Sequence, residues 1–182
     1  MKSGVSIRLD TAQSILDALK AIAKKEVLVG IPEEDSPRED VPFGNAGIGY
    51  LNEYGSAAQN IPPRPHLIPG VKSVEDQTVP ALKVAAQAAL EGKDSAAMSA
   101  LNQAGRLGVQ GVHRFITAAD FTPLSDSTVE ARARRKRKGA KAELARRAAG
   151  ESPGTALAKP LYDTGKYLAA ITHVVRDKDA DS

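Results

Sequence analysis

The chain has 182 residues, of which 42% are hydrophobic and 26% are charged, and its formal net charge is +3. This length suits one domain with a buried core and some appendages. The chain has no cysteine, which excludes disulfide bonds and thiolate metal sites. No run of about 18 apolar residues occurs, so no membrane-spanning helix is expected. The first residues lack the apolar segment of a secretion signal.

The first predicted elements are a helix and a short strand. Apolar residues recur at three- and four-residue spacing over residues 11–24, which predicts a helix that Asp10 caps. Residues 27–31 are mostly aliphatic and are followed by Pro32, which predicts a β-strand. An acidic, proline-containing loop is expected over residues 32–45.

Two long helices are predicted in the middle of the chain. The first spans residues 74–90, with Pro80 near its first turns, where proline costs least. Its side chains expected to face inward are Val79, Leu82, Ala85, Ala86 and Ala89. The second spans residues 94–118 and contains Gly105, Gly108 and Gly111. Each glycine costs up to ~1 kcal/mol relative to alanine in a helix, and is tolerated where another backbone packs closely. The two helices are expected to form an αα-hairpin.

Between the first strand and this hairpin lies a proline-rich loop. A short helix is predicted over residues 46–54, with Gly55 as its stop. The run Asn60-Ile61-Pro62-Pro63-Arg64-Pro65-His66 follows. Prolines fix φ near the polyproline II value and remove backbone donors, so this run is neither a helix interior nor a central strand. It is either a rigid connector between two elements or a loop that positions Arg64 for another subunit.

The segment 120–159 is rich in basic residues. Residues 130–147 hold nine basic residues against two glutamates, whereas residues 33–40 hold five acids and one arginine. A helix over residues 128–149 fits the composition, but its apolar residues are nearly all alanine, which bury little area. We therefore expect an extended arm or a β-lobed insertion whose order depends on neighbours.

The basic residues of this arm suggest a polyanionic partner. They are Arg132, Arg134, Arg135, Lys136, Arg137 and Lys138. Clustered cations bind phosphates with strong salt dependence. The arm has no stacking aromatics, so recognition of an RNA sequence is not expected. Three interpretations stay open: contact with DNA, contact with an acidic surface such as residues 33–40 of a neighbouring subunit, and a solvated arm without such a partner.

The last predicted elements complete an α+β fold. Asp163, Thr164 and Gly165 are expected to cap and open a short helix, and residues 171–176 to form a strand that pairs with residues 27–31. The fold is then a small, mostly antiparallel sheet packed against the N-terminal helix and the αα-hairpin. The expected core domain comprises residues 1–119 and 160–176, with the basic insertion at 120–159 and a frayed tail at 177–182.

No residue pattern indicates an enzyme. Asp163-Thr164-Gly165 is also the aspartic protease triplet, but that chemistry needs a second aspartate sharing one proton, and the chain has no second such triplet. The three histidines, His66, His113 and His173, are isolated in sequence, and no His-Glu-x-x-His motif occurs. We expect no catalytic residue, metal ligand or cofactor site.

Two stretches of the chain resemble the tail-completion (neck, head–tail joining) proteins of long-tailed bacteriophages. The first runs from Asn52-Glu53-Tyr54-Gly55 to Ile61-Pro62-Pro63-Arg64-Pro65. The second is Pro160-Leu161-Tyr162-Asp163-Thr164-Gly165. They stand in the order found in that family, and with their surroundings they cover roughly a third of the chain.

The resemblance implies a structural virion protein without catalytic chemistry, assembled in the host cytoplasm. Its expected partners are further copies in a ring, a hexamer by analogy with that family, an adaptor, tail terminator or tube protein, and genomic DNA in the channel, with no membrane. The residues expected to contact other subunits are Glu53, Tyr54, Ile61, Pro62, Pro63, Arg64 and Pro65. Arg64 is expected to engage a neighbour, and Glu53 to pair with an arginine. The alternative function is a nucleic-acid-binding accessory protein that acts through its basic arm.

Overall fold

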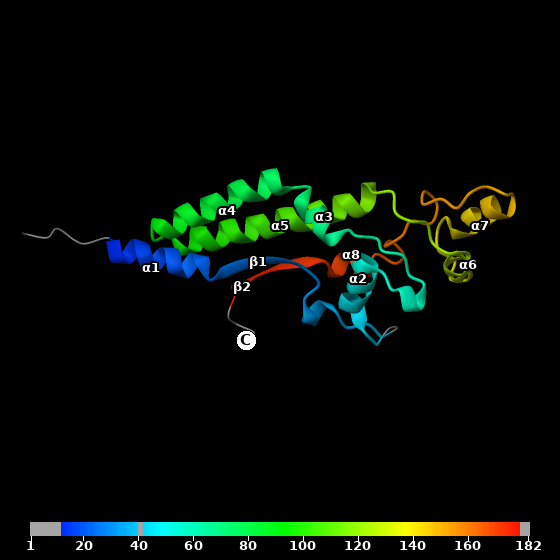
Figure 1. Ribbon diagram of the computed structural model, residues 1–182, viewed down its shortest axis with the longest axis horizontal. Coiled ribbons are helices and arrows are strands. Elements are labelled where there is room, and N and C mark those ends of the chain that lie inside the picture. The colour runs from blue at the N-terminus through cyan, green and yellow to red at the C-terminus, as the bar shows by residue number, and fades with distance from the viewer. Residues whose placement is uncertain (1–11, 40–41, 179–182) are drawn as a thin grey trace, which may run out of the picture.

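The computed structural model describes residues 12–39 and 42–178 and has the expected α+β fold (Figure 1). Its helices are α1 (Ala12–Ala23), α2 (Gly44–Tyr54), α3 (Leu67–Lys72), α4 (Glu75–Leu90), α5 (Asp94–Ala118), α6 (Asp126–Arg134), α7 (Ala140–Ala148) and α8 (Lys166–Ala170), and its strands are β1 (Lys25–Gly30) and β2 (Thr172–Asp177). The predicted cap Asp10 and the tail residues 179–182 lie outside the described ranges. None of the helices in these ranges is long and apolar enough to cross a membrane.

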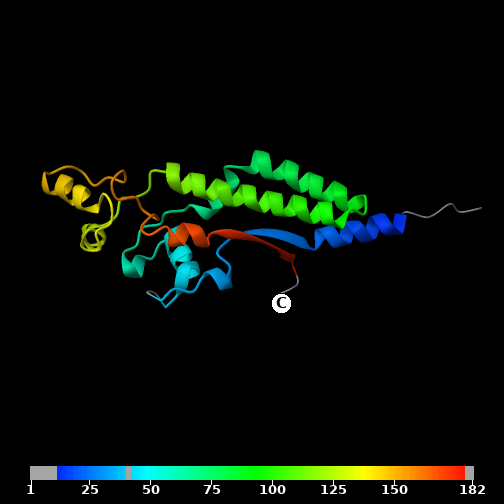
Figure 2. The same ribbon diagram turned by 180° about the vertical axis from the view of Figure 1, so that it is seen from behind.

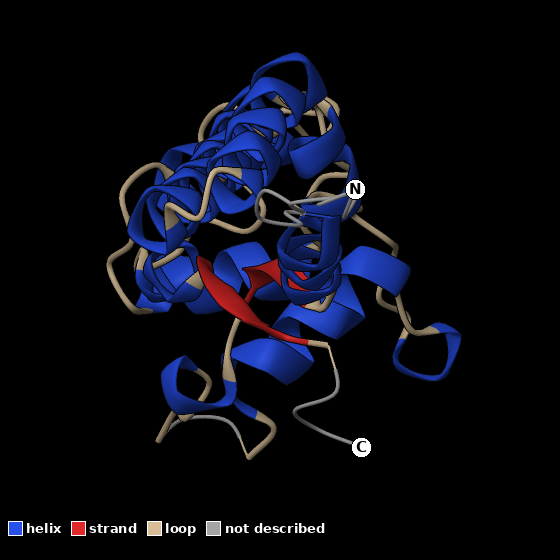
Figure 3. Ribbon diagram, turned by 90° about the vertical axis from the view of Figure 1, so that its left-hand side faces the viewer, coloured by secondary structure: helices blue, strands red, loops and turns tan. Residues whose placement is uncertain are grey.

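Helix α5 is the centre of the molecule. It packs against α4 as the predicted αα-hairpin and also contacts α3, β1 and β2. Figures 1 and 2 show α1 at one end of the elongated molecule and the α6–α7 pair at the other. Viewed end-on, the strands lie beside the helical hairpin (Figure 3). The main core joins α5 to the C-terminal segment through Val112, Ile116, Tyr167 and Ile171.

The two strands pair as predicted. They run antiparallel, with Val27 opposite Val175 and Gly30 opposite Thr172. Since Val29 and His173 contact α5 at its glycines, side-chain alternation turns Leu28 and Val174 to the opposite face of the sheet. The sheet therefore packs on the hairpin with one face only.

The glycines of α5 lie at close contacts, with side chains at Gly105 and Gly108 and with another backbone, as predicted, at Gly111. A Cβ at Gly105 would meet the His173 ring, and one at Gly108 would lie 2.8 Å from Val29 Cγ2. At Gly111 it would lie 2.5 Å from the carbonyl oxygen of Gly70 in α3. Backbone cannot yield as a flexible side chain does, so α3 packs against α5 only because Gly111 has no side chain.

We expect Gly111→Ala to lower the free energy of unfolding by about 1–3 kcal/mol, because the added methyl group separates α3 from α5. In an exposed helix the same change adds up to ~1 kcal/mol of stability, so the sign of the effect is informative. Urea unfolding measures it, with Gln110→Ala, at an exposed position of α5, as the matched control. Equal or greater stability of Gly111→Ala would contradict the close packing.

The expectation of an extended arm at residues 120–159 is wrong. Helices α6 and α7 pack together there around a small core of Leu124, Val129, Ala140 and Ala158. We call residues 120–159 the basic lobe. Gly139, with φ of +80°, separates the two helices where the sequence suggested one.

Buried ion pairs supply what the alanine-rich lobe lacks in apolar area. The Glu143 side chain is fully buried and accepts hydrogen bonds from Arg146 Nη1 (2.8 Å), Arg147 Nε (2.9 Å) and Gly154 N–H (2.8 Å). These contacts, with the Gly154 N–H the strongest, lower the pKa of Glu143 below its usual value, against the opposing effect of burial. The buried Glu143 carboxylate thus has three hydrogen-bond donors, and these contacts hold α7 and the segment that follows it together.

Two predicted inward positions of α4 are also wrong. Val79 and Leu82 are exposed, and the buried face consists of Ala85, Ala88 and Ala89. Alanine lets the axes of α4 and α5 approach closely, so the hairpin uses the small residues of α4 as its contact surface.

Candidate functional site

The proline loop folds back against the end of α2. Gly55, with φ of +75°, ends α2. A Cβ at this position would lie only 2.8 Å from the Ile61 carbonyl oxygen, so a glycine is needed for the loop to fold back here. Ser56 and Ile61 form an antiparallel bridge, and Arg64 N–H donates to the Asn52 carbonyl at 2.6 Å. The loop thus connects α2 to α3 along a fixed path, as the rigid-connector interpretation requires.

The Arg64 side chain points into the protein, which corrects the expectation that it engages a neighbouring subunit. It is only 7% exposed. Its Nε donates to the Thr122 carbonyl at 3.0 Å and its Nη2 to the Pro123 carbonyl at 3.2 Å. Burial lowers the pKa of the Arg64 guanidinium below its ordinary value. Arg64 therefore ties the proline loop to the segment between α5 and α6.

Glu53 caps α3 and does not pair with an arginine, which corrects a second expectation. Its buried carboxylate accepts the N–H groups of His66 (2.7 Å), Leu67 (2.9 Å) and Ile68 (3.2 Å). The first backbone N–H groups of a helix have no partners within it, and a negative charge is favoured there. Glu53, thirteen residues before His66 in the sequence, thus satisfies the N-terminus of α3.

His66 joins the chain that follows the first resembling segment to the chain that follows the second. Its ring is fully buried. Nδ1 lies 2.7 Å from the Arg64 carbonyl oxygen and so carries the proton that it donates there, which leaves Nε2 to accept the Tyr167 hydroxyl. Burial lowers the pKa of His66 and raises the pKa of Tyr167, so the imidazole is neutral and the phenol protonated. The isolated histidine of the sequence is a link between α3 and α8 that no local pattern indicated.

The protein is expected to lose stability as the pH falls below about 6.5, the ordinary histidine pKa. His66 and His173 both have lowered pKa values, chiefly through burial, so the unfolded chain binds protons that the folded chain does not. Each histidine then reduces the free energy of unfolding by up to about 1.4 kcal/mol per pH unit below that point. Urea unfolding between pH 7.5 and 5.0 measures the slope. A His173→Asn variant should keep the part of this pH dependence that comes from His66. A free energy of unfolding that stays constant or rises as the pH falls over this range would contradict the lowered pKa values of the two histidines.

Asp163 binds the basic lobe and does not cap α8. Its carboxylate lies 3.0 Å from Arg135 Nη1, 3.1 Å from Arg137 Nε and 3.8 Å from Arg132 Nε. The Lys166 N–H is instead accepted by Thr164 Oγ1 at 3.2 Å. Gly165, with φ of +82°, directly precedes α8 and permits its tight start. A single aspartate thus holds the turn between α6 and α7 against the core.

The six predicted cations of the basic lobe fall into two groups. Arg132, Arg135 and Arg137 bind Asp163, and Arg132 also donates to the Lys159 and Tyr162 carbonyls at 2.8 and 3.1 Å. Arg134, Lys136 and Lys138 are exposed. Three of the predicted polyanion ligands are therefore structural, and the other three face solvent.

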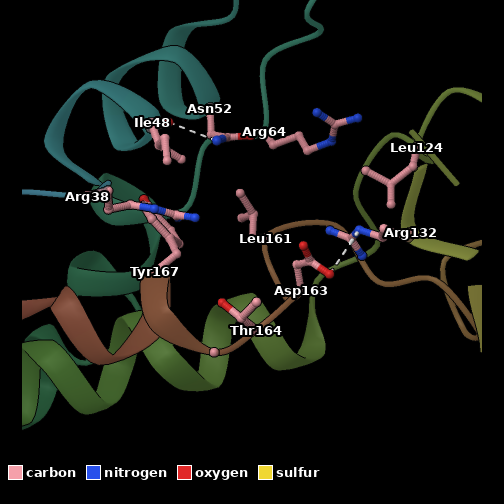
Figure 4. A pocket seen from close by; sticks show the side chains of 11 residues that line it. Arg38, Ile48, Asn52, Arg64, Leu124, Arg132, Leu161, Asp163, Thr164 and Tyr167 are labelled. Atoms are coloured by element: carbon pink, nitrogen blue, oxygen red, sulfur yellow. Dashed lines mark hydrogen bonds and ion pairs between the residues drawn. The ribbon is translucent and has the colours of Figure 1, made fainter. Parts of the chain in front are cut away.

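A pocket of about 160 Å³ lies where the proline loop, the basic lobe and the start of α8 meet (Figure 4). It is lined by Arg38, Ile48, Asn52, Arg64, Leu124, Arg132, Leu161, Asp163, Thr164, Gly165 and Tyr167. Figure 4 shows Arg38 on one side, Arg132 with Asp163 on the other, and Leu161 between them. We call Glu53, Arg64, His66, Asp163, Tyr167 and their partners the junction.

No family model matches this chain, and no curated protein or solved structure gives a significant match to it.

What the junction can do therefore follows from its geometry. Both ring nitrogens of His66 are engaged and the ring is sealed from solvent, so it cannot take a proton from a bound substrate. Asp163 is surrounded by arginines, whereas protease chemistry needs a second aspartate. Within residues 12–39 and 42–178, no cluster of three or more acidic, histidine or cysteine side chains could hold a metal ion. The junction is thus suited to holding segments together.

Of the predicted contact residues, the exposed ones are Tyr54, Pro63 and Pro65. Ile61 and Pro62 are partly buried, while Glu53 and Arg64 are buried. The Tyr54 ring packs against the Tyr50 ring in a tilted arrangement, with centroids 5.0 Å apart, and the two residues are 61% and 65% exposed. Ile68, at the start of α3, is also exposed. We call Tyr50 and Tyr54 the aromatic patch; of the two, only Tyr54 was predicted from the sequence as a contact residue.

Proposed function

We propose that this chain is a tail-completion, or head–tail joining, protein of a tailed bacteriophage that acts as a ring at the neck of the virion. The observation that supports the proposal most is a contact between residues that closely follow its two resembling segments, His66 after the first and Tyr167 after the second. About a hundred residues separate His66 from Tyr167, yet their side chains are hydrogen-bonded. Residues that lie far apart in the sequence thus meet in one junction. This junction gives one structural reason for the presence of both segments in the same chain.

The proposed mechanism is assembly. The junction fixes the end of α2 to the start of α3 through Glu53 and His66. It thereby holds the aromatic patch, whose two tyrosines lie on α2, in one orientation. Exposed tyrosines in a rigid setting are typical anchors of protein–protein contacts. In the proposal this patch contacts the adjacent neck or tail protein.

Changing both patch tyrosines, as Tyr50→Ser with Tyr54→Ser, should leave the fold intact and block the joining of heads to tails. Loss of two interface anchors lowers affinity by a factor on the order of 100 or more. The measurement is the yield of infectious particles together with the far-ultraviolet circular dichroism of the purified variant. Tyr162→Ser is the control, since Tyr162 is similarly exposed but lies outside the patch. Normal infectivity of the double variant would remove the patch from the proposed mechanism.

A second candidate function is nucleic-acid binding by the basic lobe. It is favoured by the exposure of Arg134, Lys136 and Lys138 next to arginines that are already paired. Binding through three phosphate contacts should weaken as salt rises from 50 to 200 mM, with a log–log slope of about −2.7. Tight, salt-sensitive binding of DNA by a purified chain that forms no ring would favour this function over the first. A portal gene and tail-tube genes beside the coding gene would favour the neck.

A further inference from the structure

Helix α1 carries an apolar stripe that residues 12–39 and 42–178 leave largely uncovered. Ile15, Leu16 and Leu19 are between 43% and 50% exposed. Near the end of the helix, Ile22 packs against the alanine cluster of α4 and α5. In Figures 1 and 2, α1 extends past the turn between α4 and α5. A helix of 12 residues is marginal by itself in water, so this stripe calls for a further contact.

The outer face of the sheet offers a groove of complementary character. The groove has a volume of about 590 Å³ and runs along Leu28 and Val174 to Ile31 and Pro32. Its floor is apolar, because Leu28 and Val174 face away from α5, and Leu28 is exposed. Glu33 and Glu34 stand at one end of the groove and Arg176 at the other.

The stripe and the groove belong to one chain but cannot meet within it. Lys24 alone separates α1 from β1, and the helix leads away from the strand nearly in line with it (Figure 1). Leu16 lies about 10 Å along the helix from the end of α1 at Ala23, at a rise of 1.5 Å per residue, and so points away from the strand that follows. The partner that fits is therefore a second copy.

Charge favours the same pairing. Lys20 lies in the last turn of α1 and Lys24 directly follows the helix, while the groove carries Glu33 and Glu34 at its end. Cations beside acidic side chains steer association and fix the orientation of an interface.

We propose that α1 of one copy lies in the sheet groove of the next copy. The two surfaces differ, so the contact is heterologous, and its repetition closes a ring if the rotation between copies allows it. This inference deepens the proposed ring and rests on that function for its biological setting. Each copy gives a helix to one neighbour and receives a helix from the other.

The test uses the chain's lack of cysteine. Leu16→Cys places a thiol on the stripe, and Leu28→Cys places one in the groove. Mixing the two variants under oxidising conditions should give a disulfide-linked dimer that contains one copy of each, while neither variant forms a dimer alone. Leu157→Cys, at an exposed position of the basic lobe, is the control partner and should not link to either. A chain with both Leu16→Cys and Leu28→Cys should give a ladder of linked copies that ends at the ring size.

Two results would overturn the inference. Linkage of Leu16→Cys to itself, without the mixed dimer, would show that α1 packs on α1 of the partner. Absence of linkage in a chain that forms rings would place the ring contact elsewhere and leave the proposed function standing. If the mixed dimer forms but the phage assembles normally without the protein, the proposed interface is supported and the proposed neck function is contradicted.

A charge exchange gives an independent readout. Glu33→Lys with Glu34→Lys should weaken association on the order of tenfold or more, measured by sedimentation. Lys20→Glu with Lys24→Glu, combined in the same chain, should restore it. If the variant with all four changes does not recover association, although circular dichroism shows that each protein is folded, the result would contradict the proposed orientation.

Discussion

Glu53→Ala is expected to lower the free energy of unfolding by about 3–5 kcal/mol, a large part of the stability of a domain of this size. The change removes the acceptor of three N–H groups at the start of α3 and leaves them without partners, that of His66 fully buried. The proton on His66 Nδ1 also loses a carboxylate that lies 3.2 Å away. Urea unfolding measures the loss.

Glu75→Ala is the matched control, because Glu75 lies in the first turn of α4 but is exposed. Its removal should cost about 0.3–1 kcal/mol through the helix dipole. Similar losses in the two variants would mean that Glu53 contributes only a charge near a helix end, and would contradict its role as a buried cap.

Arg64→Ala is expected to lower the free energy of unfolding by about 2–4 kcal/mol. It leaves the Thr122 and Pro123 carbonyls without their donors and opens a space beside Leu124. The effect should concentrate where the proline loop meets the basic lobe. Relative to the unchanged protein, Arg64→Ala should therefore accelerate hydrogen exchange more in α6 and α7 than in α4 and α5.

Arg64→Lys should recover little of this stability, because one ammonium group lacks the planar fork that reaches two carbonyls. Arg114→Ala, at an exposed position of α5, should be nearly neutral and serves as the control. An Arg64→Ala protein of normal stability that still fails to join heads to tails would return Arg64 to a contact with another subunit.

The fold was predictable from the sequence where the signal was local. The bounds of α5 follow from the spacing of its apolar residues and glycines, and the α5 glycines indicated a close backbone approach before its partner was known. The pairing of β1 with β2 followed from two aliphatic runs in a chain that offers few other strands. Helix α4 was placed correctly and its inward face in part, since Ala85 and Ala89 are buried as predicted while Val79 and Leu82 are exposed.

The basic lobe was not predictable from its apolar content. Its two helices depend on Glu143 and its three donors, which come from positions up to eleven residues away. A composition of alanine, arginine and glutamate fits a solvated helix and a buried ion-pair network equally well. Only the three-dimensional arrangement separates the two.

The site was partly predictable. Three of its residues, Glu53, Arg64 and Asp163, were named in advance because they stand in the resembling segments, but each was given a role that the structure replaces. Proline fixes the backbone of the loop at residues 61–65 and leaves the direction of the Arg64 side chain undetermined. His66 and Tyr167 escaped notice because their partners lie far away in sequence.

The most direct test of the proposed function is to stop translation of this chain in the phage that encodes it and to image the products of infection by electron microscopy. The account predicts filled heads and finished tails that accumulate separately, and joined particles once the purified protein is added to the lysate. Joined, infectious particles at the normal yield in the absence of the protein would contradict it.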